Sequence, residues 1–432
     1  MNESLLLTLY AAPAALLIVL YVWRRRRVEA ADARALAQAQ ADGLAEPPSL
    51  HPVVDPARCV GSSTCVRACP ESALGVVAGK AALVNPSSCI GHGACEASCP
   101  VGAITLVFGT ERRGVDIPQV DPSFETNVAG VFIVGELGGM GLIRKAAEQG
   151  RRAVATIARR PRSPLPLDVV IVGAGPAGIA AGLAAIEAKL RYALIEQEPD
   201  LGGSVLHYPR AKIAMTQPVD LPMVGRMEFT EVSKEALLAF WQRIVGRTRL
   251  AVRFGERMVR LDPSGGGHRV VTTGGHYDAG AVVLAIGRRG TPRTLDVPGE
   301  ALSKVVYRLV DPAQYRGRRV LVVGGGDSAV ETALACAAER GTRVTLAYRG
   351  DAFSRIKPAN RTRLDEARRA AALEVLLRAE IRSIAADRVE LEVDGAPRTM
   401  PNDVVIVQAG GVLPTDLLRE AGIAFERKFG TA

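Results

Sequence analysis

Residues 168–198, "DVVIVGAGPAGIAAGLAAIEAKLRYALIEQE", decide the fold, because they hold an apolar strand, a glycine-rich turn, a helix and a second strand. The backbone at Gly173, Gly175 and Gly178 can approach a pyrophosphate at the helix N-terminus, where free N–H groups stabilise anions. Glu196 ends the second strand and can accept hydrogen bonds from ribose hydroxyls. The stretch therefore predicts a dinucleotide-binding unit rather than a purely structural glycine turn.

The same unit recurs at residues 318–350, "RRVLVVGGGDSAVETALACAAERGTRVTLAYRG". One such unit normally binds one ADP moiety, so the chain is expected to bind two dinucleotides. The second strand is followed by arginines instead of a carboxylate, which suits a 2′-phosphate and favours NADPH over NADH. The residues predicted to bind this second nucleotide are Gly324, Gly326, Asp327, Ser328, Arg349 and Arg355.

An internal repeat holds six of the seven cysteines, because "CVGSSTCVRACPESAL" from Cys59 recurs 30 residues later as "CIGHGACEASCPVGAI" from Cys89. The spacing and the duplication predict a domain with two iron–sulfur clusters, each half being a strand, a cysteine-bearing loop, a short helix and a second strand. In such domains the last cysteine of each run binds the other run's cluster. The expected ligand sets are Cys59, Cys65 and Cys99 for one cluster, and Cys69, Cys89 and Cys95 for the other.

Each set is one thiolate short of four, and Ser62 and His92 occupy the positions where a further ligand would stand. His92 is a candidate imidazole ligand, and the sites could hold 3Fe-4S clusters or 4Fe-4S clusters with a non-cysteine ligand. The alternative that His92 only hydrogen-bonds nearby backbone stays open. Zinc is a second choice of metal, because its ligand spacings fit this repeat less well.

Residues Leu5 to Trp23 carry no charge and would span about 28 Å as a helix, enough to cross a bilayer. Arg24 to Arg27 follow the run and only Glu3 precedes it, so we expect an uncleaved anchor rather than a signal peptide. The positive-inside rule then predicts a single-pass protein of the cell inner membrane with the bulk of the chain in the cytoplasm. Residues 28–46 are expected to form an exposed helix or spacer that serves as a tether.

The composition agrees with a nucleotide-binding α/β protein, with 432 residues, 44 glycines and only 4% aromatic residues. The net charge is +9, but its arginines are scattered outside the one run and are not interleaved with aromatic residues. Nucleic acid is therefore not an expected partner.

Four stretches together resemble the thioredoxin-reductase-like family of pyridine-nucleotide flavoproteins: the two glycine turns, "VVLAIGRRGTPR" at 282–293 and "DVVIVQAGGVLPTDLL" at 403–418. "LGGSVLHYPR" at 201–210 and "SKEALLAFWQRI" at 233–244 are similar to the subgroup of bacillithiol disulfide reductase. The resemblance implies FAD at the first turn and NADPH at the second, in a domain inserted into the FAD domain. The residues that it assigns to FAD at the first turn are Gly173, Gly175, Pro176, Ala177, Gly178, Glu196, Gln197 and Gly203.

Two departures from that family affect the prediction. The redox C-x-x-C expected before the second turn is absent from "VVYRLVDPAQYRG", and Ala177 stands where the bacillithiol-type enzymes have a cysteine. The family's last FAD motif is found as "TNVAGVFIVGE" at 126–136, ahead of the first unit, which resembles a circular permutation. Gly135 and Glu136 would then contact FAD, and a helix starting near Gly141 would point its positive end at the flavin.

We therefore predict an α/β protein with two dinucleotide-binding domains, the FAD domain permuted, an N-terminal α+β ferredoxin-like domain and one transmembrane helix. The predicted boundaries are 5–23 for the anchor, 24–50 for a linker, 51–110 for the ferredoxin-like domain, 116–296 with 402–432 for the FAD domain and 297–401 for the NAD(P) domain. The predicted function is electron transfer between NAD(P)H and the clusters through FAD, with a redox protein or a quinone-linked complex as partner and a homodimer as a possible assembly. A low-molecular-weight disulfide or quinone reductase and a non-enzymatic redox sensor are the alternatives. No catalytic acid or base is required.

Overall fold

The computed structural model describes residues 3–41, 47, 50–91, 93–110, 114–138, 142–208, 213–287, 291–353, 356–412 and 414–430. The chain forms two compact units, one of Met1–Val115 with Lys428–Ala432 and one of Asp116–Arg427.

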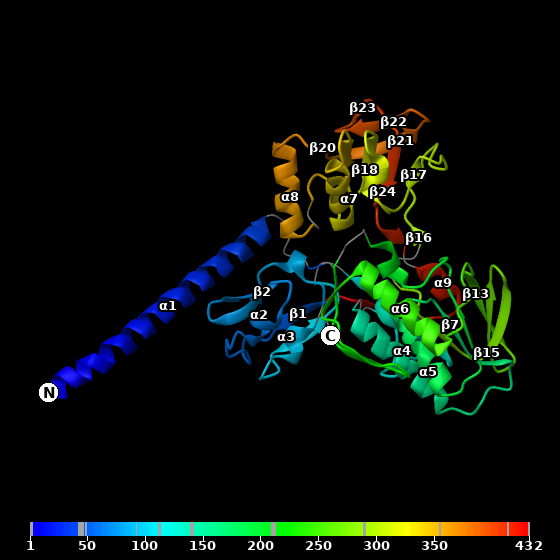
Figure 1. The fold of residues 1–432 in the computed structure, drawn as a ribbon, viewed down its shortest axis with the longest axis horizontal. Helices are drawn as coiled ribbons and strands as arrows, with labels where there is room; N and C mark the ends of the chain where they lie inside the picture. Colours follow the sequence, from blue (N-terminus) through cyan, green and yellow to red (C-terminus); the bar gives the residue numbers. More distant parts are fainter. Residues whose placement is uncertain are drawn as a thin grey trace. The chain divides into compact units, whose positions relative to one another are not determined.

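The first unit begins with a long helix, α1 (Glu3–Ala41), drawn in blue in Figure 1. It runs through the predicted anchor and past the arginine run, so the expected helix after the anchor is confirmed as far as Ala41. It is not a free tether, because the side chain of Asp32 hydrogen-bonds the cysteine-bearing domain. The structure does not describe the side chains of residues 3–11 and 14, which lie within or next to the predicted anchor. Among the helices of the described residues, none has the length and apolar character needed to cross a membrane.

The cysteine-bearing domain has the duplicated arrangement that the repeat predicts. Strand β1 pairs with β4, and β2 pairs with β3, both antiparallel. Ser63 and Gly93, which are equivalent in the repeat, both have left-handed φ angles, 58° and 77°, just before a short helix. The elements are β1 (His51–Val54), α2 (Thr64–Ala68), β2 (Leu74–Val77), β3 (Lys80–Leu83), η1 (Pro86–Ser88), α3 (Ala94–Ala97) and β4 (Ile104–Val107).

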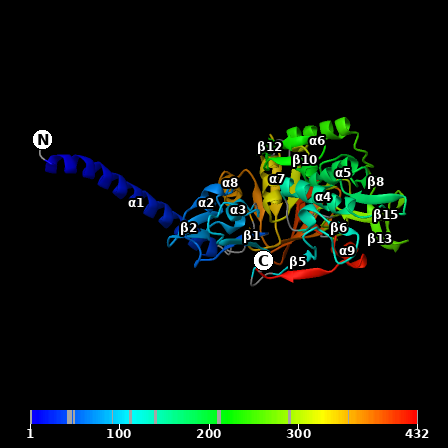
Figure 2. The ribbon, with the colours of Figure 1, turned by 90° about the horizontal axis from the view of Figure 1, so that it is seen from below.

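The second unit contains two sheets, and the first carries the first glycine turn. Its strand order is β13-β14-β15-β7-β8, with β6 pairing to β15 in parallel. Helices α4 and α5 pack on each other (Figures 1 and 2), and α6 adds the buried Trp241 to the same core. The elements are β6 (Val131–Ile133), α4 (Ile143–Ala158), β7 (Leu167–Val172), α5 (Pro176–Glu187), β8 (Tyr192–Ile195), α6 (Lys234–Thr248), β13 (Met258–Ser264), β14 (Gly267–Thr272) and β15 (Gly275–Leu284).

The second sheet is parallel, with the order β17-β24-β18-β19-β20. The predicted boundary at residue 402 is wrong, because β24 forms hydrogen bonds with β18 in this sheet. After Val407 the chain packs on the first sheet again, through the buried side chains of Leu418 and Ile423. The elements are β17 (Val305–Val306), β18 (Arg319–Val323), α7 (Asp327–Ala337), β19 (Arg343–Ala347), α8 (Pro358–Arg369), β20 (Glu374–Leu376), β21 (Ala379–Ile384), β22 (Arg388–Val393), β23 (Ala396–Pro401) and β24 (Val404–Val407).

Short elements complete the second unit. The first and last of them, β5 and β26, form a two-stranded sheet, so the two ends of the unit lie side by side (Figure 2). Adjacent ends are what a circular permutation requires. The elements are β5 (Val115–Pro118), η2 (Gly135–Gly138), η3 (Gly203–His207), β9 (Ile213–Met215), β10 (Val219–Leu221), β11 (Gly225–Met227), β12 (Glu231–Ser233), β16 (Thr291–Pro292), η4 (Pro312–Tyr315), β25 (Gly411–Val412), α9 (Thr415–Glu420) and β26 (Phe425–Lys428).

A buried carboxylate holds the start of β7 to β8. Asp168 Oδ1 accepts from Arg191 Nη2 at 2.8 Å, and its Oδ2 accepts from the Arg191 N–H at 2.9 Å. Hydrogen bonds from Arg191 hold the pKa of Asp168 well below its usual range. A depressed pKa stabilises the fold above the unfolded value of about 3.9, and this contribution is lost as the pH falls through the lower folded value.

We predict that Asp168→Asn lowers the free energy of unfolding by about 2 kcal/mol at pH 7, because a buried charged acceptor is lost. The exposed ion pair of Asp262 with Arg260 provides the control, and Asp262→Asn should cost less than about 0.5 kcal/mol. Urea unfolding followed by circular dichroism at pH 7 and pH 3 measures both. Equal losses for the two variants, or a loss for Asp168→Asn that does not shrink at low pH, would contradict the prediction.

Candidate redox sites

The structure brings together the first predicted set of thiols. Burial raises the pKa of Cys65, and the neighbouring thiols of Cys59 and Cys99 raise it further. Cys59 and Cys65 are buried in the small core of the domain, and Cys99 packs against it. The set combines two cysteines of one run with the last cysteine of the other, as predicted.

The second set is grouped in the same way. Burial raises the pKa of Cys95 to about 11, with the thiols of Cys89 and Cys69 adding to the increase. These three cysteines line one pocket together with apolar residues such as Pro52, Leu74 and Leu106. Ionised thiolates in such a place need a compensating positive charge, which an iron centre would supply. The pocket therefore fits a cluster bound by Cys69, Cys89 and Cys95.

Backbone N–H groups are directed at the sulfur atoms. Ala73 N–H donates to Cys69 Sγ at 3.4 Å, and its repeat equivalent Ala103 N–H donates to Cys99 Sγ at 3.2 Å. Burial opposes ionisation of Cys99, but this and other backbone N–H groups outweigh it and lower its pKa. Donors of this kind stabilise negative charge on cluster sulfurs and so influence the reduction potential.

Of the two positions in the repeat that lack a cysteine, the structure describes Ser62 but not His92. Ser62 is exposed, and its hydroxyl lies 3.1 Å from that of Thr64. His92 lies outside the described residues, so its role as a ligand stays a prediction. Within the described ranges, no three His, Cys, Asp or Glu side chains are grouped as ligands of a single metal ion.

The first glycine turn has the close backbone contacts that the sequence predicts. A Cβ on Gly178 would lie 1.7 Å from the carbonyl oxygen of Gly173, and Gly173 itself has φ +106°. A Cβ on Gly203 would lie 3.0 Å from the Cα of Gly175, so the backbone at Gly203 packs directly against the backbone of the turn. Helix α5 begins here at Pro176, which leaves its N-terminal N–H groups available to an anion. This arrangement fits a pyrophosphate.

Glu196 lies immediately after β8 and faces this turn. Its Oε2 accepts from Ala174 N–H at 2.6 Å, and its Oε1 accepts from Glu198 N–H at 2.9 Å. Burial raises its pKa, although these backbone donors act in the opposite direction. Each carboxylate oxygen retains a second acceptor site, so the geometry permits the predicted hydrogen bonds to a ribose. Gln197, the next predicted residue, is exposed.

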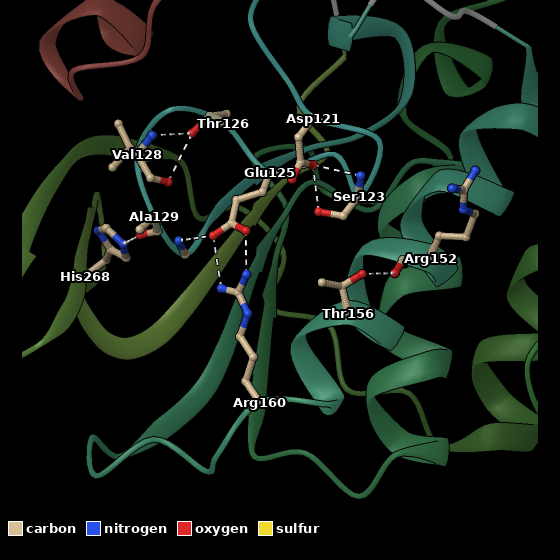
Figure 3. A network of polar contacts seen from close by, with 11 residues as sticks. Asp121, Ser123, Glu125, Thr126, Val128, Ala129, Arg152, Thr156, Arg160 and His268 are labelled. Carbon is tan, nitrogen blue, oxygen red and sulfur yellow. Dashed lines mark hydrogen bonds and ion pairs between the residues drawn. The ribbon is translucent and has the colours of Figure 1, made fainter.

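A network of polar contacts holds the loop of the permuted motif that leads into β6 (Figure 3). Glu125 Oε1 accepts from Gly130 N–H at 2.6 Å and from Arg160 Nη1 at 3.0 Å. His268 Nε2 lies 2.8 Å from the Ala129 carbonyl oxygen, which fastens the loop to β14. These contacts fix the entry into β6 and the residues that follow it.

Gly135 is placed next to Ala177, because a Cβ on Gly135 would lie 3.2 Å from the Cβ of Ala177. Its N–H donates to the buried Gln149 on α4 at 2.7 Å. Glu136 follows, half-buried, at the start of η2. The structure thus brings Gly135 to the first turn, which is the arrangement that a permuted final motif would produce. Gly141 lies outside the described residues, and α4 begins at Ile143.

Among the glycines of the second turn, only Gly324 comes close to other backbone. A Cβ on Gly324 would lie 2.3 Å from the Gln408 carbonyl oxygen, whereas a Cβ on Gly326 would meet nothing within 4 Å. Asp327 Oδ1 accepts from Lys357 N–H at 2.8 Å and from Asn360 Nδ2 at 2.7 Å. Asp327 therefore also anchors α8 to α7, a structural role that the sequence did not indicate.

Of the two predicted phosphate-binding cations, the structure describes Arg349, which follows the end of β19. Arg349 is exposed, one residue after Tyr348, whose ring lies against Gly325 and stacks on Phe353 with centroids 5.4 Å apart. Ser328 is exposed at the start of α7. Arg355 lies outside the described residues.

An ion pair that the sequence did not reveal joins the two sheets of the second unit. Arg308, next to β17, donates to both carboxylate oxygens of Glu198, at 3.0 and 3.2 Å. It holds the pKa of Glu198 below its usual range. The partners are 110 residues apart in the sequence, and neither belongs to a motif. Because Glu198 N–H also donates to Glu196, the pair links the second sheet to the predicted ribose carboxylate.

No redox-active thiol is apparent beside either turn in the described part of the second unit. The remaining cysteine, Cys336, is fully buried in the core under α7. Burial raises its pKa to about 12, so its thiolate is strongly disfavoured at neutral pH. The prediction of a small buried apolar residue is confirmed.

Two dinucleotide turns in one unit and two thiol sets in the other define a class of protein: a flavin- and pyridine-nucleotide-dependent oxidoreductase with an iron–sulfur domain. Comparison with protein families agrees. Residues 170–430 match the pyridine nucleotide-disulphide oxidoreductase family, and residues 51–100 match the 4Fe-4S dicluster domain. The chain belongs to the pyridine nucleotide-disulphide oxidoreductase family and carries a 4Fe-4S dicluster domain.

The relatives of this chain include ferredoxin–NADP reductases from several organisms. The one from Thermus thermophilus is 32% identical over 272 residues, which are 60% of this chain and 78% of the relative. The one from Ignicoccus hospitalis is 31% identical over 188 residues, 43% of this chain and 57% of the relative. The chain therefore spans only a little more than half the length of the second relative.

The similar solved structures include bacillithiol disulfide reductases. That of Bacillus cereus is 27% identical with a TM-score of 0.52, covering 59% of this chain and 81% of that one. That of Staphylococcus aureus is 24% identical with a TM-score of 0.51, covering 59% of this chain and 79% of that one, and shows the shared fold.

We predict that Gly178→Ala weakens FAD binding at least about tenfold, or about 1.4 kcal/mol, because the added methyl group would push α5 away from the turn. Gly246→Ala in α6 is the matched control, since a Cβ there would meet nothing within 4 Å. Fluorescence titration of the apoprotein with FAD gives the affinity, and circular dichroism checks folding. Similar affinities for both variants would show that the turn does not carry the flavin.

Proposed function

We propose that this protein is a membrane-anchored oxidoreductase that transfers electrons between NAD(P)H and two iron–sulfur clusters, with FAD as the intermediate carrier, and exchanges them with a redox protein or a quinone-linked complex. One observation carries the proposal: a dicluster domain with its thiols grouped in two sets is covalently joined to a unit whose relatives are named ferredoxin–NADP reductases. A fused domain of ferredoxin type would take the place of a separate ferredoxin.

FAD, when bound, accepts two electrons from a nicotinamide and can release them singly. The residues of the first turn would hold its pyrophosphate on the N-terminus of α5, and Glu196 would orient its ribose. Arg349 would recognise the 2′-phosphate of NADPH at the second turn. Binding and orientation are the protein's contribution, and no proton transfer by a side chain is required.

Disulfide reduction is less well supported. Ala177 and the cysteine-free stretch before β18 leave no thiol at either position where the family places one. Cys336 is buried with a raised pKa and cannot serve as a substitute. A quinone or a small disulfide could still be reduced directly at the flavin, and the cluster variants below separate that case.

Membrane attachment rests on the N-terminal part of α1. The apolar residues 16–23 are 40–67% exposed, so the described part of the first unit leaves this stretch open to its surroundings. The guanidinium of Arg27 lies 4.0 Å from the ring centre of Trp23, a pairing suited to a membrane–water interface. We propose insertion into the cell inner membrane with the rest of the chain in the cytoplasm. A chain beginning at Val28 should then leave the membrane fraction, and its retention there would refute this part.

We predict that NADPH, added without oxygen, bleaches the flavin absorbance and also produces electron paramagnetic resonance signals of reduced clusters. A sample reduced with dithionite gives the reference signals. The variant with Cys59, Cys65, Cys89 and Cys95 all changed to Ser should keep flavin reduction and lose those signals. A flavin that bleaches while the iron centres never change oxidation state would refute the proposal, and undiminished acceptor reduction by the variant would favour a direct quinone or disulfide reductase.

We predict that Arg349→Ala raises the KM for NADPH at least about tenfold and changes the KM for NADH less than about twofold, because one charged hydrogen bond to the 2′-phosphate is lost. Arg340→Ala is the matched control, since Arg340 is exposed beyond the C-terminal end of α7, away from the turn. Steady-state kinetics with both nucleotides measures the effect. Equal changes for NADPH and NADH would contradict the choice of cofactor.

A further inference from the structure

Helix α1 supplies hydrogen-bond acceptors to the hairpin of β2 and β3. Asp32 Oδ2 accepts from Val76 N–H at 2.7 Å, and Glu29 Oε1 accepts from Gly79 N–H. A two-stranded hairpin leaves outward N–H groups without strand partners, and a carboxylate is a strong acceptor for them. Both acids lie outside residues 51–100, the part that matches the dicluster domain.

The contact between α1 and the hairpin is close. A Cβ on Gly75 would lie 2.6 Å from the carboxyl carbon of Asp32, so β2 needs a glycine where the helix crosses it. Glu29, Asp32 and Ala39 are buried or half-buried and lie about on one side of the helix, while Arg34 is exposed. The helix therefore docks through one face.

The same hairpin carries a donor to a cysteine of the first set. Ala81 N–H donates to Cys59 Sγ at 3.5 Å, and Ala81 is the register partner of Val76, whose N–H binds Asp32. Lys80 Nζ also donates to the Cys59 carbonyl oxygen at 2.6 Å. One pair of facing residues thus connects Asp32 on one side with Cys59 on the other.

The other cysteines receive their donors from nearby in the sequence. Those of Cys69 and Cys99 come from four residues further along the chain. Cys65, Cys89 and Cys95 are hydrogen-bonded by backbone within two residues. Cys59 is different, since its donor is 22 residues away and belongs to the hairpin that α1 holds.

We propose that Asp32, assisted by Glu29, is a positioning residue for the cluster bound by Cys59, Cys65 and Cys99. By fixing the hairpin, it fixes the N–H group that faces Cys59, and this raises the reduction potential of that cluster alone. The direction follows because an N–H donor stabilises the more negative, reduced state. The inference rests on the clusters of the proposed function.

The test compares Asp32→Ala with Asp32→Asn, which keeps an acceptor but removes the charge. Arg34→Ala is the matched control, because Arg34 is exposed and its described hydrogen bond goes to Ala30 of the same helix. Potentiometric titration followed by electron paramagnetic resonance gives the potential of each cluster, with Cys65→Ser assigning the first. Hydrogen exchange followed by mass spectrometry reports on residues 74–83.

Asp32→Ala should speed amide exchange in the hairpin about tenfold. It should also lower the equilibrium constant for reduction of the first cluster about threefold to tenfold, which is a fall in reduction potential of up to 59 mV for one electron. The second cluster should not change, Asp32→Asn should recover much of both effects, and Arg34→Ala should leave both at the parent values. If Asp32→Ala does not fold, Glu29→Ala, which removes the acceptor for Gly79 N–H, carries the same expectations at smaller size.

Unchanged potentials with both clusters present would overturn the inference and leave the proposed function intact. Equal shifts of both clusters would also overturn it, because the effect would then be one of overall charge or folding. A parent protein without any iron–sulfur signal would overturn the proposed function together with the inference.

Discussion

The second unit depends on backbone meeting backbone at the start of α5. A Cβ on Gly178 would lie 1.7 Å from the Gly173 carbonyl oxygen, and a Cβ on Gly150 of α4 would lie 2.0 Å from the Ala177 carbonyl oxygen. Any side chain at these positions would push the helices away from the turn. Because both are glycines, α4 and α5 close over the sheet and leave the N-terminus of α5 open to an anion.

This packing also explains how a displaced motif can serve the same site. Strand β6 enters the first sheet beside β15, and Gly135 then lies against Ala177. The contact is made in space, so it does not require the motif to follow the rest of the domain in the sequence. The pairing of β5 with β26 closes the two ends of the unit next to each other.

The chemistry of the thiols is divided between the two units. In the first, six cysteines are grouped in threes, and backbone N–H groups donate to the sulfur atoms of Cys59, Cys69 and Cys99. In the second, Cys336 is sequestered in an apolar core. This chain belongs to a family named for disulphide chemistry, but all its cysteines except Cys336 lie in a metal-binding domain. The same cofactors can therefore serve electron transfer instead of disulfide reduction.

The sequence by itself determined both glycine turns, the duplicated domain and the two cysteine sets, because those features depend on short-range spacing that a repeat or a motif preserves. It placed the boundary at residue 402 wrongly, since whether β24 pairs with β18 depends on long-range hydrogen bonds. Tertiary structure alone showed Gln149 beneath Gly135, Arg308 on Glu198, and Asp32 on the hairpin beside Cys59. These contacts join residues that have no shared pattern, and only the packing of distant elements creates them.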